Sequence, residues 1–377
     1  MELKEYRFDE VTINFDKKRV PLSGAQREKR QGNFRYYGAQ GVIDHIDDFI
    51  FDGTYLLIAE DGENLKSKKQ NIAQVVEGQF WVNNHAHIVQ GNELCNTRYL
   101  CYLLNSMDLS GYVTGSAQPK LSQANLNAVT LFLPSITVQE RIVECLYLFD
   151  KKIAVNQKIN DNLQQQLFSL YENMATASPC LKEYTLSNLC DFQEGYVNPP
   201  QTHPEYFDGE VKWLRAVDIN ESFIIETSRT LTKAGFESAK KSALLFEPNT
   251  IAISKSGTIG RLGIIADYMC GNRAVINIAP HDTNMLAFIY CFLKSKQREF
   301  PDMAVGSVQK NLYVSLLEPL SVSIPDNESL TAFNAVGASI LGMIHNNCVE
   351  NTDLANLRDT ILPKLMSGEI DVSSVLL

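Results

Sequence analysis

The feature that most constrains the fold is an internal repeat at a fixed offset. The segment GSAQPKLSQANLNAVTLFLP, which begins at Gly115, aligns without a gap with GSVQKNLYVSLLEPLSVSIP, which begins 191 residues later at Gly306. Upstream, weaker likenesses keep the same order, among them TRYLCYLLNS with LAFIYCFLKS. A repeat of this kind in a chain of 377 residues predicts two similar domains rather than one.

A heptad pattern follows each copy of the repeat. Between Leu146 and Met174 the apolar positions step by three and four residues, interrupted by two asparagines, and the offset of 191 returns two asparagines in the second pattern. The two pairs are Asn156 and Asn160, and Asn347 and Asn351. The pattern predicts long helices over about 138–174 and up to about 365, each packed on the other. We predict that the four asparagines meet where the two helices pack on each other, because a buried amide favours the register in which it finds a partner.

The globular halves combine short apolar strands with short apolar helices. We expect strands at Tyr55–Ala59, Val129–Leu133, Thr250–Ser254 and Ser321–Ile324, and helices at Tyr99–Asn105 and Ala287–Lys294. The predicted fold class is α+β, with two similar mixed α/β domains joined by two long helices packed as a coiled coil, and with internal pseudo-two-fold symmetry. The expected boundaries are 1–135 and 178–326 for the domains, 136–177 for the central helix, and 327–377 for the C-terminal helix and tail.

Charge is segregated along the chain. The formal net charge of −10 argues against a simple nucleic-acid binder, but a net charge averages over surfaces that face different partners. The stretch Lys17–Arg35 carries +6, whereas Asp44–Glu63 has seven acids and neither lysine nor arginine. Some feature other than charge must therefore locate a binding face.

Neither metal binding nor membrane insertion is indicated. The eight cysteines form no C-x-x-C pair and have no histidine at ligand spacing, so we interpret them as reduced, mostly buried thiols. No run approaches the roughly 18 apolar residues of a membrane helix, and the beginning of the chain does not resemble a signal peptide. We expect a cytoplasmic protein.

Tests for catalytic motifs are mostly negative. NPPQ, at Asn198–Gln201, is similar to the Asn-Pro-Pro-aromatic loop of amino-methyltransferases, but Gln201 stands at the aromatic position and a proline-stiffened turn is the better interpretation. SGTIGRLG, at Ser256–Gly263, fits no phosphate-binding loop and predicts a hairpin turn that could contact DNA. The histidines form no H-E-x-x-H and no serine lies in a nucleophile elbow, so we predict no active site in this chain.

Three segments resemble the specificity subunit of type I restriction-modification systems. They are NFRYYGAQGVIDHIDDFIFDGTYLLIAEDGENL from Asn33, the run LPSITVQERIVECLYLFDKKIAVNQKINDNLQQQLFSLYENM from Leu133, and LRDTILPKLMSGEIDV from Leu357. The resemblance implies two target recognition domains, each reading one half of a split DNA sequence, and two helical spacers that pack as an antiparallel coiled coil and set the gap. It also implies partners: two adenine-modification subunits that use S-adenosylmethionine, and restriction subunits that use ATP with Mg. No cofactor is expected in the chain itself.

Candidate DNA contacts follow the repeat. Gln118 and Gln309 occupy equivalent turns and could each pair bidentately with adenine, or could only cap their own turns. Lys120 and Lys310 would favour phosphate. The other candidates are Tyr36, Tyr37, Lys66, Lys68 and Lys69 in the first half, and Lys255, Thr258, Arg261 and Arg273 in the second.

Two other functions stay open on sequence grounds. One is a coiled-coil protein–protein adaptor in which the basic stretch near the N-terminus is incidental. The other is a methyltransferase with a degenerate NPPQ loop.

Overall fold

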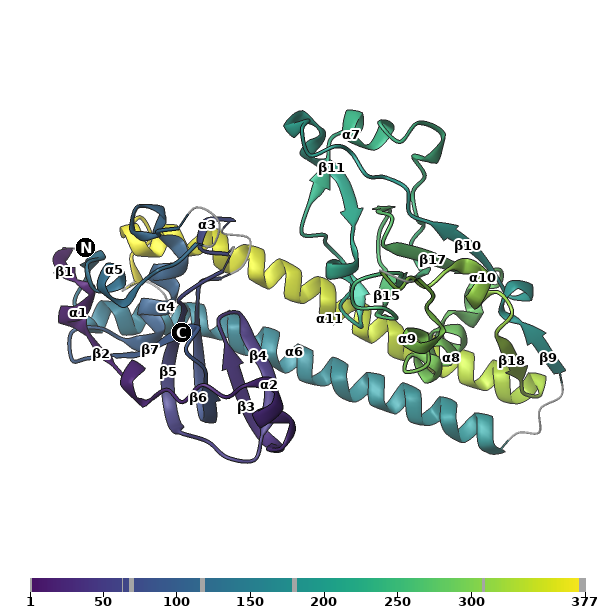
Figure 1. Ribbon diagram of the computed structural model, residues 1–377, viewed down its shortest axis with the longest axis horizontal. Helices are drawn as coiled ribbons and strands as arrows, with labels where there is room; N and C mark the ends of the chain where they lie inside the picture. Colours follow the sequence, from purple (N-terminus) through teal and green to yellow (C-terminus); the bar gives the residue numbers. More distant parts are fainter. Residues whose placement is uncertain are drawn as a thin grey trace. The chain divides into compact units, whose positions relative to one another are not determined.

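The computed structural model describes residues 2–62, 64–67, 71–115, 119–177, 182–306 and 309–372. The chain divides into two compact units: unit 1 consists of Met1–Lys151 and Ala355–Leu377, and unit 2 of Lys152–Leu354. The division falls inside each of two long helices, α6 (Ile136–Ala177) and α11 (Asn327–Ser367). Each unit therefore contains one globular domain and a portion of both helices (Figure 1).

Unit 1 is built on a six-stranded sheet of order β2-β7-β5-β6-β3-β4. Its strands are β2 (Thr12–Asn14), β3 (Gln31–Gly38), β4 (Gly41–Ile46), β5 (Phe51–Ala59), β6 (Ala73–Val82) and β7 (Ala86–Gly91). A separate antiparallel pair joins β1 (Lys4–Arg7) to β8 (Thr130–Leu133). The short helices are α1 (Phe8–Val11), α2 (Gly24–Glu28), α3 (Asn64–Ser67), α4 (Thr97–Ser106) and α5 (Gln123–Asn127), with 3-10 turns η1 (Asp16–Lys18) and η2 (Ser110–Tyr112).

Unit 2 has a five-stranded sheet of order β10-β17-β14-β15-β12 and a smaller one of order β13-β11-β16. The strands of the larger sheet are β10 (Cys190–Glu194), β12 (Phe223–Ile224), β14 (Ile251–Ser254), β15 (Leu262–Ile265) and β17 (Val275–Pro280). Those of the smaller sheet are β11 (Phe207–Leu214), β13 (Thr230–Leu231) and β16 (Cys270–Gly271), and β9 (Lys182–Thr185) pairs with β18 (Ser321–Ile324). The short helices are α7 (Lys233–Glu237), α8 (Leu286–Lys296), α9 (Phe300–Met303) and α10 (Val314–Leu317), with 3-10 turns η3 (Leu186–Asn188), η4 (Pro204–Tyr206), η5 (Ala216–Asp218), η6 (Lys240–Ser242) and η7 (Thr283–Met285).

The sequence repeat is also a repeat of sheet topology. In unit 1, β2, β7, β5 and β6 form successive antiparallel pairs, and β3 then adds to β6 in parallel. In unit 2, β10, β17, β14 and β15 do the same, and β12 adds to β15 in parallel. The fold class predicted from the sequence is therefore confirmed, and the expected strands and helices occur to within a few residues at each end.

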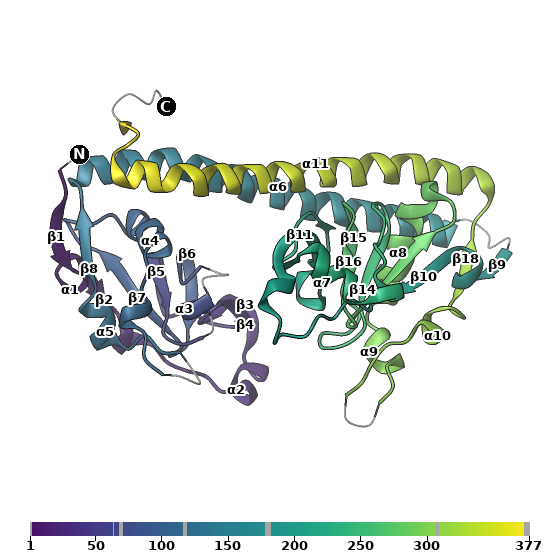
Figure 2. The same ribbon diagram turned by 90° about the horizontal axis from the view of Figure 1, so that it is seen from above.

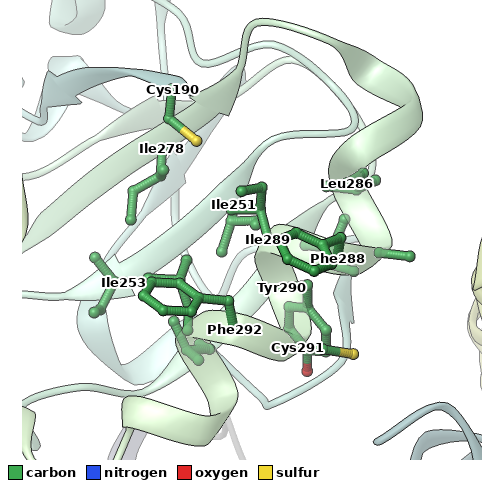
Figure 3. Packing of buried hydrophobic residues seen from close by; sticks show 14 of the residues in the cluster. Cys190, Ile251, Ile253, Ile278, Leu286, Phe288, Ile289, Tyr290, Cys291 and Phe292 are labelled. Atoms are coloured by element: carbon green, nitrogen blue, oxygen red, sulfur yellow. The ribbon is translucent and has the colours of Figure 1, made fainter. Parts of the chain in front are cut away.

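Burial explains why α8 and its sheet have these sequences. All eight residues from Leu286 to Leu293 are buried, because the helix is apolar on every side and is enclosed by the domain core. The β14 residues Ile251 and Ile253 contribute to the same cluster, and Figure 3 shows them facing α8. In unit 1 the corresponding helix α4 is amphipathic and is capped by Asn96, whose side chain accepts hydrogen bonds from two backbone amides.

Within each unit α6 and α11 lie side by side and antiparallel (Figures 1 and 2). The heptad interpretation holds for most positions: Leu146 and Leu167 are 0% and 1% exposed, and Ile344 is 1% exposed. It is wrong for Leu170, which is 42% exposed, because the contact face of a straight helix drifts away from a strict seven-residue repeat.

Arg358 stands at a heptad position where an apolar residue is expected, and a polar cluster in unit 1 accounts for it. Its Nη1 donates to Asp150 on α6 over 2.6 Å, and the hydroxyl of Tyr102 on α4 donates to the same carboxylate. The Arg358 guanidinium is 21% exposed, so this ion pair is partly shielded from water. It fastens α4, α6 and α11 to one another.

Among the described residues, seven cysteines are free thiols and no cluster of side chains suited to a metal ion occurs. Burial raises the pKa of Cys95, Cys190 and Cys270 to about 12, so these three are protonated at neutral pH. No helix in the described ranges is both long and apolar enough to cross a membrane.

Candidate nucleic-acid interface

Four loops meet at one edge of the unit 1 sheet, and we call them the loop edge of unit 1. They are 15–19 after β2, 60–62 after β5, 83–85 before β7, and the described residues 114–115 and 119–120 of a fourth turn. Backbone hydrogen bonds join three of them: the Glu60 amide donates to the His85 carbonyl over 2.9 Å, and the Gly62 amide donates to the Pro119 carbonyl over 3.3 Å. Directly after the fourth turn, the Leu121 amide donates to the Glu60 carbonyl over 2.8 Å. The Arg19 guanidinium, 3.1 Å from Glu60, joins the first loop to the others.

Unit 2 has an equivalent loop edge. It consists of 194–197 at the end of β10, 255–261 after β14, 272–274 before β17, and the described residues 305–306 and 309–311 of a fourth turn. The Leu312 amide donates to the Lys255 carbonyl over 2.9 Å, and the Lys255 amide donates to the Ala274 carbonyl over 2.7 Å. The connections therefore repeat those of unit 1, with Lys255 in the place of Glu60.

The turn that carries the candidate glutamines closes in the same way in both units. Thr114 and Lys120 exchange two backbone hydrogen bonds of 2.8 Å, and the residues 191 positions later, Val305 and Asn311, exchange two of 3.0 and 2.9 Å. The first residue inside each turn is a glycine with positive φ, 86° at Gly115 and 140° at Gly306. The offset found in the sequence thus marks positions that are equivalent in structure.

The aromatic candidates of unit 1 are core residues. Tyr36 is 0% exposed, and its hydroxyl accepts a hydrogen bond from the Leu22 amide over 2.9 Å. Tyr37 is 4% exposed, and this burial raises the pKa of its hydroxyl. The prediction that these two rings contact DNA is wrong, because the pleat of β3 turns both side chains into packed clusters on the two faces of the sheet.

Two of the lysine candidates of unit 1, Lys66 and Lys120, lie at the loop edge. The Lys66 ammonium donates to the Gly115 carbonyl over 3.0 Å, which ties α3 to the 114–120 turn. The Lys120 side chain is 54% exposed and lies 3.2 Å from a carboxylate oxygen of Glu60. Lys68, Lys69 and Gln118 lie outside the described residues.

Three cations of the basic stretch Lys17–Arg35 are ion-paired within unit 1. The pairs are Arg19–Glu60, Arg27–Asp44 and Arg30–Asp47, at 3.1, 2.9 and 2.8 Å. The acids come from the acidic stretch Asp44–Glu63: Asp44 and Asp47 lie in or directly after β4, which pairs with β3, and Glu60 follows β5. Acids of the fold thus neutralise much of the positive charge of the basic stretch. This stretch does not by itself mark a DNA-binding face.

In unit 2 the candidates differ in availability. The Lys255 ammonium is 2.9 Å from Glu194, its side chain is only 14% exposed, and it lies over the ring of Tyr313, so it serves the structure of the loop edge. Thr258, Arg273, Gln309 and Lys310 are exposed, and Arg261 is half-buried. Arg261, Arg273 and Lys310 have no ion-pair partner among the described residues. These cations are free to meet a phosphate.

A buried polar network of unit 1 was missed by the sequence analysis. His87 is 1% exposed, with Nδ1 2.6 Å from Asp16 and Nε2 2.8 Å from the Leu121 carbonyl. Both ring nitrogens therefore face acceptors, and both donate only when the ring is an imidazolium. Burial alone would raise the pKa of Asp16, but hydrogen bonds from His87 and from the Ile88 amide hold it below its usual range. Neither residue belongs to a recognisable motif, so no sequence signal pointed to the pair.

The two loop edges carry opposite charge at one equivalent position. Glu60 in unit 1 lies between Arg19 and Lys120, whereas Lys255 in unit 2 is paired with Glu194. The loop edges are therefore alike in backbone and different in side chains, which suits them to bind different partners or sequences.

The four asparagines of the heptad pattern lie together within unit 2. Asn156 Nδ2 donates to Asn351 Oδ1 over 2.9 Å and to Glu350 over 2.6 Å, and Asn347 Nδ2 donates to Asn160 Oδ1 over 2.8 Å. Asn156 and Asn160 are 1% and 6% exposed. These amides link α6 to α11 by hydrogen bonds that need their partners at matching heights along the helices.

The two motifs examined for chemistry are turns. Pro200 and His203 close a β-turn through a backbone hydrogen bond of 3.2 Å, and Gln201 accepts from Arg229 over 3.0 Å, so the interpretation of NPPQ as a turn is confirmed. SGTIGRLG joins the antiparallel strands β14 and β15, which confirms the expected hairpin turn.

Comparisons with known proteins agree with this geometry. A type I restriction enzyme specificity subunit of Methanocaldococcus jannaschii is 25% identical over 305 residues, which are 74% of this chain and 70% of that protein. A Haemophilus influenzae relative, named as a specificity subunit of the same enzyme class, is 35% identical over 138 residues, and the match spans only 35% of its length. The crystal structure of the S subunit of a type I restriction-modification system from M. genitalium has the same fold, with a TM-score of 0.52, 16% identity, and coverage of 97% of this chain and 96% of that one.

The family model for the type I restriction modification DNA specificity domain matches residues 2–165 and again residues 181–352. The two matches cover most of the chain, and each contains one copy of the repeated sheet and one loop edge. This chain belongs to the family of type I restriction modification DNA specificity domains and carries two of them.

Proposed function

We propose that the chain is the non-catalytic DNA-reading subunit of a type I restriction-modification complex. Its recognition domains, 1–135 and 178–326, each read one half of a split target, and the helical segments 136–177 and 327–377 set the spacing and dock two modification subunits. The observation that carries this proposal is the repeated loop edge, because two loop sets with one backbone plan and different side chains suit two different half-sites.

The cofactors belong to the partners in this proposal. S-adenosylmethionine binds the modification subunits that methylate adenine, and ATP with Mg binds the restriction subunits. The chain itself contributes recognition and acts in the cytoplasm, where it meets double-stranded DNA.

Methylome sequencing of cells with and without this gene tests the proposal. A split, asymmetric motif methylated at adenine should be present with the gene and should disappear on deletion. A motif that persists unchanged in the deletion strain would exclude the proposed function, and so would methyl transfer by the purified chain without modification subunits.

Gln309→Ala should relax the motif at one position of one half-site. A bidentate contact between glutamine and adenine is worth about 1–3 kcal/mol of discrimination, so methylation at sites with another base there should rise roughly 5- to 150-fold. Methylome sequencing of the variant measures this. Lys310→Gln, one residue away and equally exposed, is the matched control, and it should lower methylation uniformly without changing the motif. An unaltered motif in Gln309→Ala would show that this side chain does not read a base and only caps its own turn.

The adaptor hypothesis is favoured by one observation, the internal pairing of the basic stretch, because those cations are unavailable to phosphate. Salt titration of DNA binding by the assembled complex separates the two functions. A DNA reader loses affinity steeply as salt rises, whereas an adaptor shows absent or salt-insensitive binding.

A further inference from the structure

A hollow of about 580 Å³ lies in unit 2 between loops from both of its sheets. Its walls come from the segment after β10, from η4, from the segment after α7, and from the turn between β16 and β17. The side chains that matter here are Tyr196, Asn198, Tyr206, Lys240, Ser242 and Arg273.

Two cations of the hollow are exposed and lack an ion-pair partner among the described residues. They are Lys240 and Arg273, which come from different segments. Other cations of unit 2, such as Lys212 and Lys294, contact carboxylates within 3.0 Å. Among the described residues that line the hollow, Glu237 is the acid, and it lies 3.8 Å from Lys233 in an exposed pair. The hollow is thus a concave surface with more cations than acids, and its two cations have no carboxylate within ion-pair distance in the described part of the chain.

The remaining walls suit a nucleotide backbone. Tyr196 is 50% exposed, so its ring offers a flat apolar face to a deoxyribose, while Tyr206 stacks on His203 with ring centroids 4.9 Å apart. Asn198 and Ser242 are exposed and add neutral hydrogen-bonding groups. Lys240 has a φ of 53°, a conformation that residues other than glycine rarely adopt and that is often kept where a side chain must be placed for binding.

The hollow is continuous with the loop edge of unit 2. Arg273 belongs to the 272–274 loop, whose Ala274 carbonyl accepts from the Lys255 amide. The Tyr196 hydroxyl donates to Glu194 over 2.8 Å, and Glu194 also holds the Lys255 ammonium. A duplex lying on the loop edge, where Gln309 is exposed, would therefore bring its backbone past this hollow.

We propose that the hollow binds one backbone phosphate of duplex DNA through Lys240 and Arg273, and so fixes the position of the second domain on its half-site. This inference rests on the proposed function. It assigns to the hollow a sequence-independent role, because phosphate contacts set register and orientation while base contacts set sequence.

The test uses the full chain assembled with its modification subunits. Two DNA duplexes are compared: one contains the motif identified by methylome sequencing, and the other does not. Affinity is measured from low to moderate salt for Lys240→Gln, Arg273→Gln and the double variant. The variants should bind both duplexes more weakly, by a similar factor. In the double variant the slope of log affinity against log salt should be less negative by about 0.9, the value for one phosphate. The methylated motif should stay the same.

Lys241→Gln is the matched control, since Lys241 is an exposed lysine next to Lys240 that does not line the hollow. An unchanged slope in the double variant would overturn the inference. A changed motif would also overturn it and would show that the two residues read bases. Weaker assembly with normal DNA affinity would overturn it as well and would show that the hollow binds an acidic segment of a partner subunit. If the wild-type complex itself shows no salt-dependent DNA binding, the proposed function fails. If the wild-type complex shows such binding and the variants bind with the same salt dependence, this inference alone fails.

Discussion

Replacing the four register asparagines together with leucine should stabilise the pairing of α6 with α11 and change the spacing of the split motif. The amides of Asn156 and Asn160 are buried, and the Asn156 Oδ1 atom has no hydrogen-bond partner among the described residues. Leucine at all four positions removes this desolvated polar surface, so the free energy of unfolding of the helix pair should rise. It also removes the hydrogen bonds that favour one register, and a slip of one heptad corresponds to about 10 Å along a helix.

The measurement is methylome sequencing of the four-leucine variant, read as the number of unspecified bases between the half-sites. We expect a mixture of spacings or a new one. The double variant Asn162→Leu and Asn346→Leu is the control, because both residues are exposed amides on the same helices. Asn351→Leu alone should instead lower stability by about 1–3 kcal/mol, because it takes a partner from the buried Asn156. A single unchanged spacing in the four-leucine variant would show that packing, not the amides, sets the register.

The periodicity of the sequence made the two long helices predictable. Their contacts with the domains were not predictable from it. The offset of 191 that relates Asn156 to Asn347 also relates Thr114 to Val305, and equivalent residues close equivalent turns. A repeat fixes which positions correspond, whatever the side chains are. Arg358 shows the limit, since a heptad pattern cannot reveal that Asp150 and Tyr102 lie beside it.

The candidate site was harder to predict because exposure is a property of the fold. An exposed aromatic ring and a buried one look the same in a sequence, and Tyr36 and Tyr37 proved to be packed on opposite faces of a sheet. A run of cations likewise does not disclose its counter-ions, which here come from a strand that pairs with it. Lys240 and Arg273, two of the cations without an ion-pair partner in the described part of the chain, are far apart in the sequence and form no pattern there.

Asp16→Asn should destabilise unit 1 by about 3–5 kcal/mol at pH 7, the usual effect of removing one member of a buried ion pair. The Asp16 carboxylate contacts His87 and Arg19 and accepts from the Ile88 amide over 2.8 Å, and it is 8% exposed. Asparagine keeps the shape but removes the negative charge, which leaves the Arg19 guanidinium, 3.4 Å away and 15% exposed, without this counter-ion. Urea denaturation followed by circular dichroism, with amide hydrogen exchange of β7 to localise the effect, measures the loss. Asp9→Asn is the control, because Asp9 is 39% exposed in a surface pair with Arg7 and should change stability by less than about 1 kcal/mol.

The same pair predicts how unit 1 responds to acid. The pKa of Asp16 is lower in the folded chain than its unfolded value of about 3.9, so the carboxylate stabilises the fold above that pH. As the pH falls through the folded-state pKa, the carboxylate is protonated and its contribution is lost. The difference in unfolding free energy between wild type and Asp16→Asn should therefore be constant from pH 7 to about 5 and should shrink below about 4. A difference that stays constant down to pH 2 would mean that the charge of Asp16 contributes nothing, and that its hydrogen bond to the Ile88 amide alone anchors the loop edge to β7.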